Sequence, residues 1–211
     1  MTAKPTRRPA AKAAPLPRIV VLVEAPAWRK RIPDAAALVR RFARAAIKAA
    51  VAEGVPTPPV ARPWTLTVVL GDDGRLQELN RDFRGKNKPT NVLSFPAWEG
   101  AEPPVAGEAL NLGDIAVAFA TTAAESRSQG KTLADHLAHL TVHGVLHLFG
   151  YDHLDKSQAE DMESLERAVL ARFGIRDPYV LRAARKAAPR VRKPRLTEPG
   201  GRARQAARKR T

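Results

Sequence analysis

Apolar runs and helical periodicity divide the middle of the chain into strands that come first and helices that dominate later. Residues 19–23 and 65–70 are apolar and rich in β-branched residues, as is typical of buried strands. Residues 91–95 predict a third strand and residues 114–118 a fourth. This order predicts an α+β fold: a single domain with one mixed four-stranded sheet packed with helices.

Helical spacing of apolar residues and turn residues define the remaining elements. Residues 34–52 are rich in alanine and predict a long helix. Residues 54–63 contain four prolines and predict a loop, whereas Gly-Asp-Asp-Gly at 71–74 predicts a turn and cap before a short helix. From 119 to about 173 the pattern is helical, with an interruption around Gly150.

Positive charge lies in two tails rather than in the predicted domain. The chain has 211 residues and a net charge of +15, of which residues 1–18 carry +5 and residues 182–211 carry +11, leaving −1 for residues 19–181. The tails lack apolar periodicity, so we expect them to be disordered on either side of a domain at 19–181. Such tails release counterions from phosphates, which favours contact with nucleic acid over a role in solubility alone.

Composition also excludes several classes of protein. The chain has no cysteine, so disulfides, iron–sulfur clusters and a cysteine nucleophile are excluded. Its apolar runs are far shorter than the roughly 20 residues that span a bilayer. We therefore expect a cytoplasmic protein without a membrane segment.

The histidines carry the candidate chemistry, because all five fall between positions 136 and 153. His143 and His147 are four apart, which places them side by side on a helix. Gly150 allows the chain to turn, so that His153 can return as a third ligand. The spacing is that of the metzincin zinc site. Three imidazoles with an open position predict one catalytic Zn²⁺ per chain, against the alternative of packed or surface histidines.

One position departs from the protease pattern. In metzincins a glutamate follows the first histidine and acts as general base, whereas here that residue is Gly144. Glycine cannot transfer a proton, so the sequence disfavours proteolysis.

Several motifs resemble one known family. The segment from His143 to His153 matches the signature H-G-x-L-H-L-x-G-Y-D-H of the YbeY endoribonuclease family without a gap. Residues 84–96 resemble that family's R-x-K-D-x-P-T-N-V-L-S-F-P block, except that Asn87 stands where Asp is more usual. Residues 112–115 and 177–179 are similar to two further family motifs.

This resemblance implies a function and a set of partners. It implies a zincin-like metal site in a zinc-dependent, single-strand-specific endoribonuclease that matures the 3′ end of 16S rRNA and acts in ribosome biogenesis and ribosome quality control. The implied zinc ligands are His143, His147 and His153, and the functional arginine is Arg84. The implied partners are single-stranded rRNA, the small ribosomal subunit, its protein uS11 and the GTPase Era.

Other roles remain open at the level of sequence. Arg84 would pair with the scissile phosphate, although a surface arginine at a helix end is the alternative. Lys86 and Lys88 would follow the RNA backbone or lie in a solvated loop. His139 would contact substrate, shuttle a proton or be a satisfied core histidine, and we expect His136 near the surface.

Two acids and the tryptophans are less defined. Asp114 and Asp152 are candidates to orient a ligand histidine or to act as base, and Asp152 could instead cap the following helix. Trp28, Trp64 and Trp98 could stack on bases, but core packing is the better interpretation.

Two other functions fit the same residues. One is a metal-dependent hydrolase of another substrate, which the open site would permit. The other is a non-catalytic ribosome-assembly factor whose metal is structural. The basic tails favour the endoribonuclease and the assembly factor over the other hydrolase.

Overall fold

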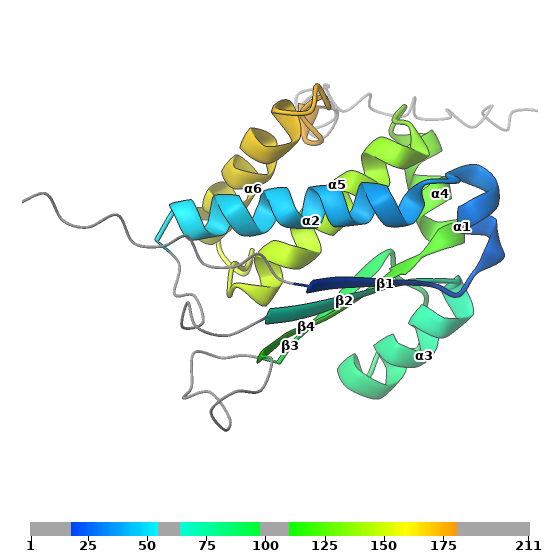
Figure 1. Cartoon of the computed structure of the whole chain (residues 1–211). Coiled ribbons are helices and arrows are strands. Elements are labelled where there is room, and N and C mark those ends of the chain that lie inside the picture. The colour runs from blue at the N-terminus through cyan, green and yellow to red at the C-terminus, as the bar shows by residue number, and fades with distance from the viewer. Residues whose placement is uncertain (1–17, 55–63, 98–109, 181–211) are drawn as a thin grey trace, which may run out of the picture. The chain divides into compact units, whose positions relative to one another are not determined.

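Four strands form one mixed sheet in the computed structural model, which describes residues 18–54, 64–97 and 110–180 (Figure 1). The strands are β1 (Arg18–Val23), β2 (Trp64–Gly71), β3 (Val92–Pro96) and β4 (Leu110–Ala118). Their order is β1-β2-β4-β3. β2 is parallel to both β1 and β4, and β3 is antiparallel to β4. The predicted α+β class and mixed four-stranded sheet are confirmed.

Helices cover both faces of this sheet, as Figure 1 shows. The described helices are α1 (Pro26–Arg31), α2 (Ala35–Ala52), α3 (Asp73–Arg84), α4 (Phe119–Ser128), α5 (Leu133–Leu148) and α6 (Lys156–Ala171). α2 and α5 pack against one face and α3 against the other. On the α3 face, Leu76 packs with Ala116 and Ala118 of β4. α6 contacts both α5 and α2.

The core explains how α5 is held close to its neighbours. Small residues such as Ala43, Ala46 and Ala50 of α2 are fully buried, and small side chains allow two helix backbones to approach closely. Trp64 at the start of β2 lies against Phe149 just after α5, with 6.4 Å between ring centroids. Burying apolar area of this kind is the main stabilising contribution to the fold.

Two features differ from the prediction. The short helix α1 was not predicted. It is anchored by Trp28, which is fully buried and whose indole N–H donates to the carbonyl of Gly71 at 3.0 Å. The helical stretch after residue 119 breaks twice rather than once. Besides the confirmed break at Gly150, α4 ends at Ser128 and Thr132 begins α5 as its N-cap. Trp28 and Trp64 are core residues, so the packing interpretation is confirmed for both.

Several predictions concern parts of the chain outside the described residues. They are the two basic tails at 1–17 and 182–211, most of the loop at 54–63, and Trp98. Among the helices of the described ranges, none has the length and apolar character needed to cross a bilayer.

Candidate metal centre

One side of α5 carries a row of histidines at intervals of three or four residues. His136, His139, His143 and His147 follow one another along the helix, with 6.0, 6.2 and 4.6 Å between successive ring centroids. The helix begins at a defined point, since the Thr132 hydroxyl accepts from the backbone N–H of residue 135 at 3.0 Å. Because α5 begins at this cap, His136, His139, His143 and His147 fall on the same side of the helix.

The chain turns sharply after α5 and returns to the same site. Gly150 adopts a φ of +82°, a left-handed conformation that other L-residues rarely take. Its N–H donates to the carbonyl of His147 at 3.0 Å, and the next N–H donates to Leu146 at 3.1 Å. The ring of His153 then lies 5.6 Å from His143 and 5.1 Å from His147, between centroids. The turn predicted at Gly150 is thus present.

The three converging imidazoles fit a bound metal ion. One ligand atom from each of His143, His147 and His153 lies within 4.8 Å of the others. The Nε2 atoms of His143 and His147 are 3.1 Å apart. Two nitrogens on a tetrahedral zinc ion, each at about 2.0–2.1 Å, would be about 3.3 Å apart. His153 is exposed and the other two are partly exposed, so the site is open to solvent.

The electrostatics of the site favour the neutral imidazole that binds metal. Burial, with a smaller contribution from the neighbouring charges of His143 and His153, lowers the pKa of His147 to about 4. A histidine with this pKa is neutral at physiological pH, and its nitrogen lone pair is free for a metal.

A buried carboxylate of α6 supports the row from behind. Glu166 is fully buried, and its Oε1 accepts from Nδ1 of His143 at 2.8 Å while its Oε2 accepts from Nε2 of His139 at 2.8 Å. Burial raises the pKa of Glu166, but the hydrogen bonds from His139 and His143 outweigh it and bring the pKa to about 2. Sequence reasoning did not identify Glu166. Its position among the buried residues Met162 and Val169 of α6 was the available indication.

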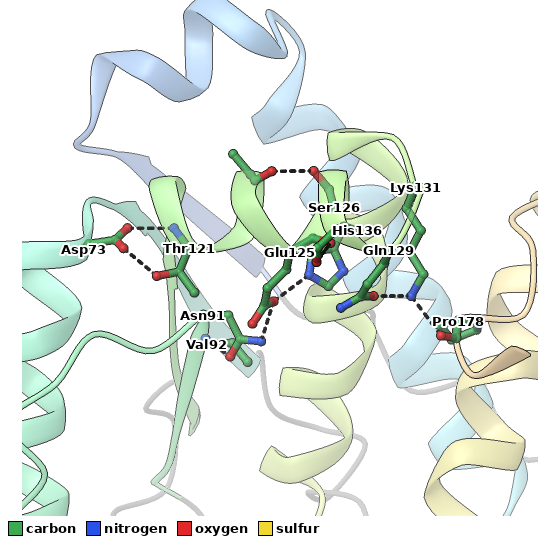
Figure 2. Close-up of polar contacts among 12 residues, drawn as sticks. Asp73, Asn91, Val92, Thr121, Glu125, Ser126, Gln129, Lys131, His136 and Pro178 are labelled. Atoms are coloured by element: carbon green, nitrogen blue, oxygen red, sulfur yellow. Dashed lines mark hydrogen bonds and ion pairs between the residues drawn. The ribbon is translucent and has the colours of Figure 1, made fainter. Parts of the chain in front are cut away.

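A second carboxylate–histidine pair lies nearer the start of α5. Nε2 of His136 lies 2.8 Å from Oε2 of Glu125 on α4, and the amide of Asn91 donates to the same oxygen at 2.9 Å (Figure 2). Asn91 also accepts from the N–H of Val92, at the start of β3. His136 is 2 % exposed, so the expectation that it lies near the surface was wrong. It instead ties α5 to α4 and β3.

Gly144 lies where α5 meets the sheet. A Cβ at this position would be 2.9 Å from Cγ2 of Ile115 and 3.2 Å from Oγ of Ser94. A glutamate after the first metal ligand would therefore collide with the sheet. This supports the interpretation that the site does not use the protease base.

Neither candidate aspartate forms a hydrogen bond with a histidine ring in the described chain. Asp152 accepts from the backbone N–H of His153 at 2.8 Å, and Asp155 rather than Asp152 caps α6 by accepting from Gln158. The capping role proposed for Asp152 was wrong. Asp114 lies on β4 opposite Phe95 and forms no hydrogen bond with a histidine of the described chain.

The basic segment after α3 is exposed. Arg84 is the last residue of α3, and Gly85 ends the helix in a left-handed conformation. Arg84, Lys86 and Lys88 are all exposed, and within the described ranges none of the three forms an ion pair. Phe83 is 68 % exposed, and its ring lies 5.0 Å from that of Phe95 on β3. Unpaired cations beside an exposed aromatic ring are typical of surfaces that bind nucleic acid.

Hydrogen bonds fix the backbone that presents these cations. The amide of the buried Asn80 donates to the carbonyl of Lys88 at 2.7 Å. Asn87, at the position that departs from the family pattern, accepts from Gln77 at 2.9 Å. Asn87 thus contacts α3. Of the residues predicted for substrate binding, Lys86 and Lys88 are accessible, whereas the His139 side chain is 13 % exposed and contacts Glu166.

Fold and site together define an α+β protein with an open three-histidine centre and an exposed basic segment. A family model described as "Endoribonuclease YbeY" matches residues 30–174. The chain therefore belongs to the YbeY endoribonuclease family, which confirms the family and the enzyme class inferred from the sequence.

Two similar sequences agree with this assignment. The chain is 50% identical over 163 residues to "Endoribonuclease YbeY" of Paramagnetospirillum magneticum, covering 76% of this chain and 94% of that protein. It is 48% identical to the protein of the same name from Azorhizobium caulinodans, covering 78% and 98%. A solution structure of a Thermotoga maritima protein aligns with a TM-score of 0.45 at 21% identity, covering 83% of this chain and 100% of the other.

Proposed function

We propose that this protein is a zinc-dependent, single-strand-specific endoribonuclease that matures the 3′ end of 16S rRNA and acts in ribosome biogenesis and ribosome quality control. The observation that carries the proposal is the convergence of three histidine ligand atoms within 4.8 Å at a solvent-accessible site. Membership of the YbeY family supports RNA as the substrate.

His143, His147 and His153 would hold one Zn²⁺. A zinc ion with an open position lowers the pKa of bound water and polarises a phosphoryl oxygen. The protein's own contribution is to hold the three imidazoles convergent and to keep the imidazole of His147 neutral. The pKa of about 4 at His147 serves this end, because protons do not compete for its lone pair near neutral pH.

The exposed cations supply the affinity for RNA in this proposal. The Arg84 guanidinium would pair with the scissile phosphate and offset the charge that grows there during cleavage. Lys86 and Lys88 would contact neighbouring phosphates, since no carboxylate of the described chain neutralises them. Phe83 offers an exposed ring on which an unpaired base could stack, an interaction that a base-paired duplex denies.

The proposed setting is the small ribosomal subunit in the cytoplasm. The basic segments at 1–18 and 182–211 would increase the affinity for rRNA without sequence preference. The small-subunit protein uS11 and the GTPase Era are the proposed protein partners.

The proposal is tested by cleavage of a single-stranded RNA that carries the 3′ precursor sequence of 16S rRNA. Wild type, Arg84→Ala and Arg81→Ala are compared with the metal content determined for each. Arg81 is the matched control, because it lies one turn earlier on α3, is exposed and pairs with Asp82 at 2.8 Å. A duplex of the same sequence tests strand selectivity.

We expect Arg84→Ala to lose cleavage while retaining metal, and Arg81→Ala to cleave like wild type. If wild type cuts no better than a metal-stripped sample, the nuclease proposal fails. A His147→Ala variant that loses stability and ribosome binding together would then support the assembly factor with a structural metal. Turnover of a small ester in place of RNA would support another hydrolase.

A further inference from the structure

The buried carboxylate of Glu166 joins two histidines that belong to different parts of the site. One oxygen is 2.8 Å from Nδ1 of His143, a candidate metal ligand, and the other is 2.8 Å from Nε2 of His139, which is not in the ligand group. The Glu166 side chain has no exposed surface. A fully buried carboxylate with both oxygens engaged is held in one orientation.

This geometry fixes which nitrogen of His143 faces the metal position. An ionised carboxylate only accepts hydrogen bonds, so the nitrogen against it must carry the proton. A histidine binds a metal as neutral imidazole, which has a single N–H; with Nδ1 against the carboxylate, that N–H is on Nδ1 and the lone pair that would face the metal is on Nε2. Nε2 is the atom of His143 that lies 3.1 Å from Nε2 of His147.

His139 restrains the carboxylate from the second side. It lies one turn before His143 on α5, and its bond to Oε2 prevents Glu166 from rotating away from His143. The two bonds also connect α5 to α6 at the metal site. A change at Glu166 therefore alters the orientation of His143 as well as its tautomer.

We propose that Glu166 is the positioning residue of the metal centre: it sets the tautomer and the orientation of His143 and so raises the affinity for the metal ion. The inference rests on the proposed metal site at His143, His147 and His153. Carboxylates behind a ligand histidine typically contribute about 10- to 100-fold in metal affinity.

The Glu125–His136 pair provides a control for the role proposed for Glu166. Glu125 contacts His136 at the same distance of 2.8 Å and from a neighbouring helix, but His136 is not in the candidate ligand group. Replacing either glutamate removes the partner of an α5 histidine, although the Glu125 side chain is 33% exposed whereas that of Glu166 is fully buried. Only the replacement at Glu166 touches a ligand.

The experiment compares wild type, Glu166→Gln and Glu125→Gln in the full chain. Zinc affinity is measured by competition with a chromophoric chelator, and the ligand geometry by the visible absorption spectrum of the Co²⁺-substituted protein. Thermal unfolding of the metal-free proteins reports the stability that each change removes. Glutamine is nearly isosteric, so Glu166→Gln mainly removes charge and the ability to accept on both atoms.

We expect Glu166→Gln to weaken zinc binding about 10- to 100-fold and to change the Co²⁺ spectrum. Glu125→Gln should lower stability while leaving both metal measurements as in wild type. Wild-type zinc affinity in Glu166→Gln, or an equal loss in Glu125→Gln, overturns the proposal. If Glu166→Gln does not fold, Glu166→Asp is measured instead; it keeps the charge but is one methylene shorter, and unchanged affinity there also overturns the proposal.

These readouts do not require RNA. A wild-type protein that binds zinc but leaves RNA intact would refute the proposed function and leave this inference standing. A protein in which Glu166→Gln binds zinc normally would refute the inference and leave the cleavage assay unaffected.

Discussion

The hydroxyl of Ser94 on β3 donates a hydrogen bond to the carbonyl of Gly144 on α5, with 3.2 Å between the two oxygens. The contact requires the helix backbone to approach the strand without an intervening side chain. Because Gly144 directly follows His143, the close approach also fixes how far the first ligand stands from the sheet.

Gly144→Ala should therefore destabilise the protein although alanine is the better helix former. In an unobstructed helix interior the change would stabilise by up to about 1 kcal/mol. Here the new methyl group would meet the buried Ile115 at 2.9 Å, and overpacking of this kind costs about 1–3 kcal/mol. Urea unfolding of the metal-free protein measures the difference, and a gain in stability would show that the helix–strand contact is not tight.

The left-handed turn at Gly150 leads to a separate prediction about zinc affinity. Gly150 and Gly54 have similar φ values of +82° and +81°, and a Cβ added at either residue would meet no other side chain or backbone atom within 4 Å. Alanine at either position therefore has a similar backbone cost of about 1–2 kcal/mol. Only Gly150→Ala also disturbs the return of His153. We expect zinc affinity, measured by chelator competition, to fall in Gly150→Ala and to stay unchanged in Gly54→Ala.

The lowered pKa of Glu125 leads us to expect that the stability of the protein depends on pH in the acid range. Burial raises the pKa of Glu125, but the hydrogen bonds from His136 and Asn91 together lower it by more. The pKa of Glu125 in the folded protein therefore lies below the ordinary value of 4.5. The unfolded chain then binds the proton at higher pH than the folded chain does. The contribution of Glu125 to the free energy of unfolding is fully present above pH 4.5. It is lost as the pH falls through the pKa that Glu125 has in the folded protein.

Glu125→Gln should remove this dependence. The unfolding free energies of wild type and variant, both with chelator, are compared by urea titration at decreasing pH. We expect the advantage of wild type to shrink toward acid pH. A difference that stays constant with pH would contradict the assignment of the shift to Glu125.

The unpaired lysines after α3 predict how RNA binding responds to salt. Each phosphate contact that is removed should reduce the slope of log affinity against log salt by about 0.7 for a single strand. We expect this reduction in Lys86→Ala and in Lys88→Ala, measured by fluorescence anisotropy with labelled RNA. Lys156 is the control, because it is 93% exposed but lies 3.5 Å from Glu160 on α6. An equal effect of Lys156→Ala would indicate a general charge effect.

Local patterns predicted the elements and the ligand spacing, because both depend on nearby residues. The spacing of His143 and His147, and the glycine before His153, are properties of one short segment. The strands at 19–23 and 65–70 were identified for the same reason. Their order in the sheet, with β4 inserted between β2 and β3, depends on long-range pairing that no local pattern contains.

The supporting groups were missed because they depend on how helices pack. Asp152 was a reasonable candidate partner for a ligand histidine since it is adjacent to His153, yet Glu166 from the next helix occupies that role for His143. Glu166 shares a helix face with the apolar Met162 and Val169, a weak indication of burial, because a charged residue at such a position usually marks the edge of that face. The packing of α6 against α5 shows that Glu166 is fully buried and which histidines it contacts.

The three ligand imidazoles all come from residues 143–153, a short stretch of chain. An unfolded chain keeps these histidines near one another and therefore retains some affinity for the ion. A bound ion stabilises a fold only through the ratio of its affinities for the folded and unfolded states. Metal binding will accordingly raise the melting temperature of this protein by less than its affinity alone would imply, and the folded state must be held mainly by the packing of α5 against the sheet, α2 and α6.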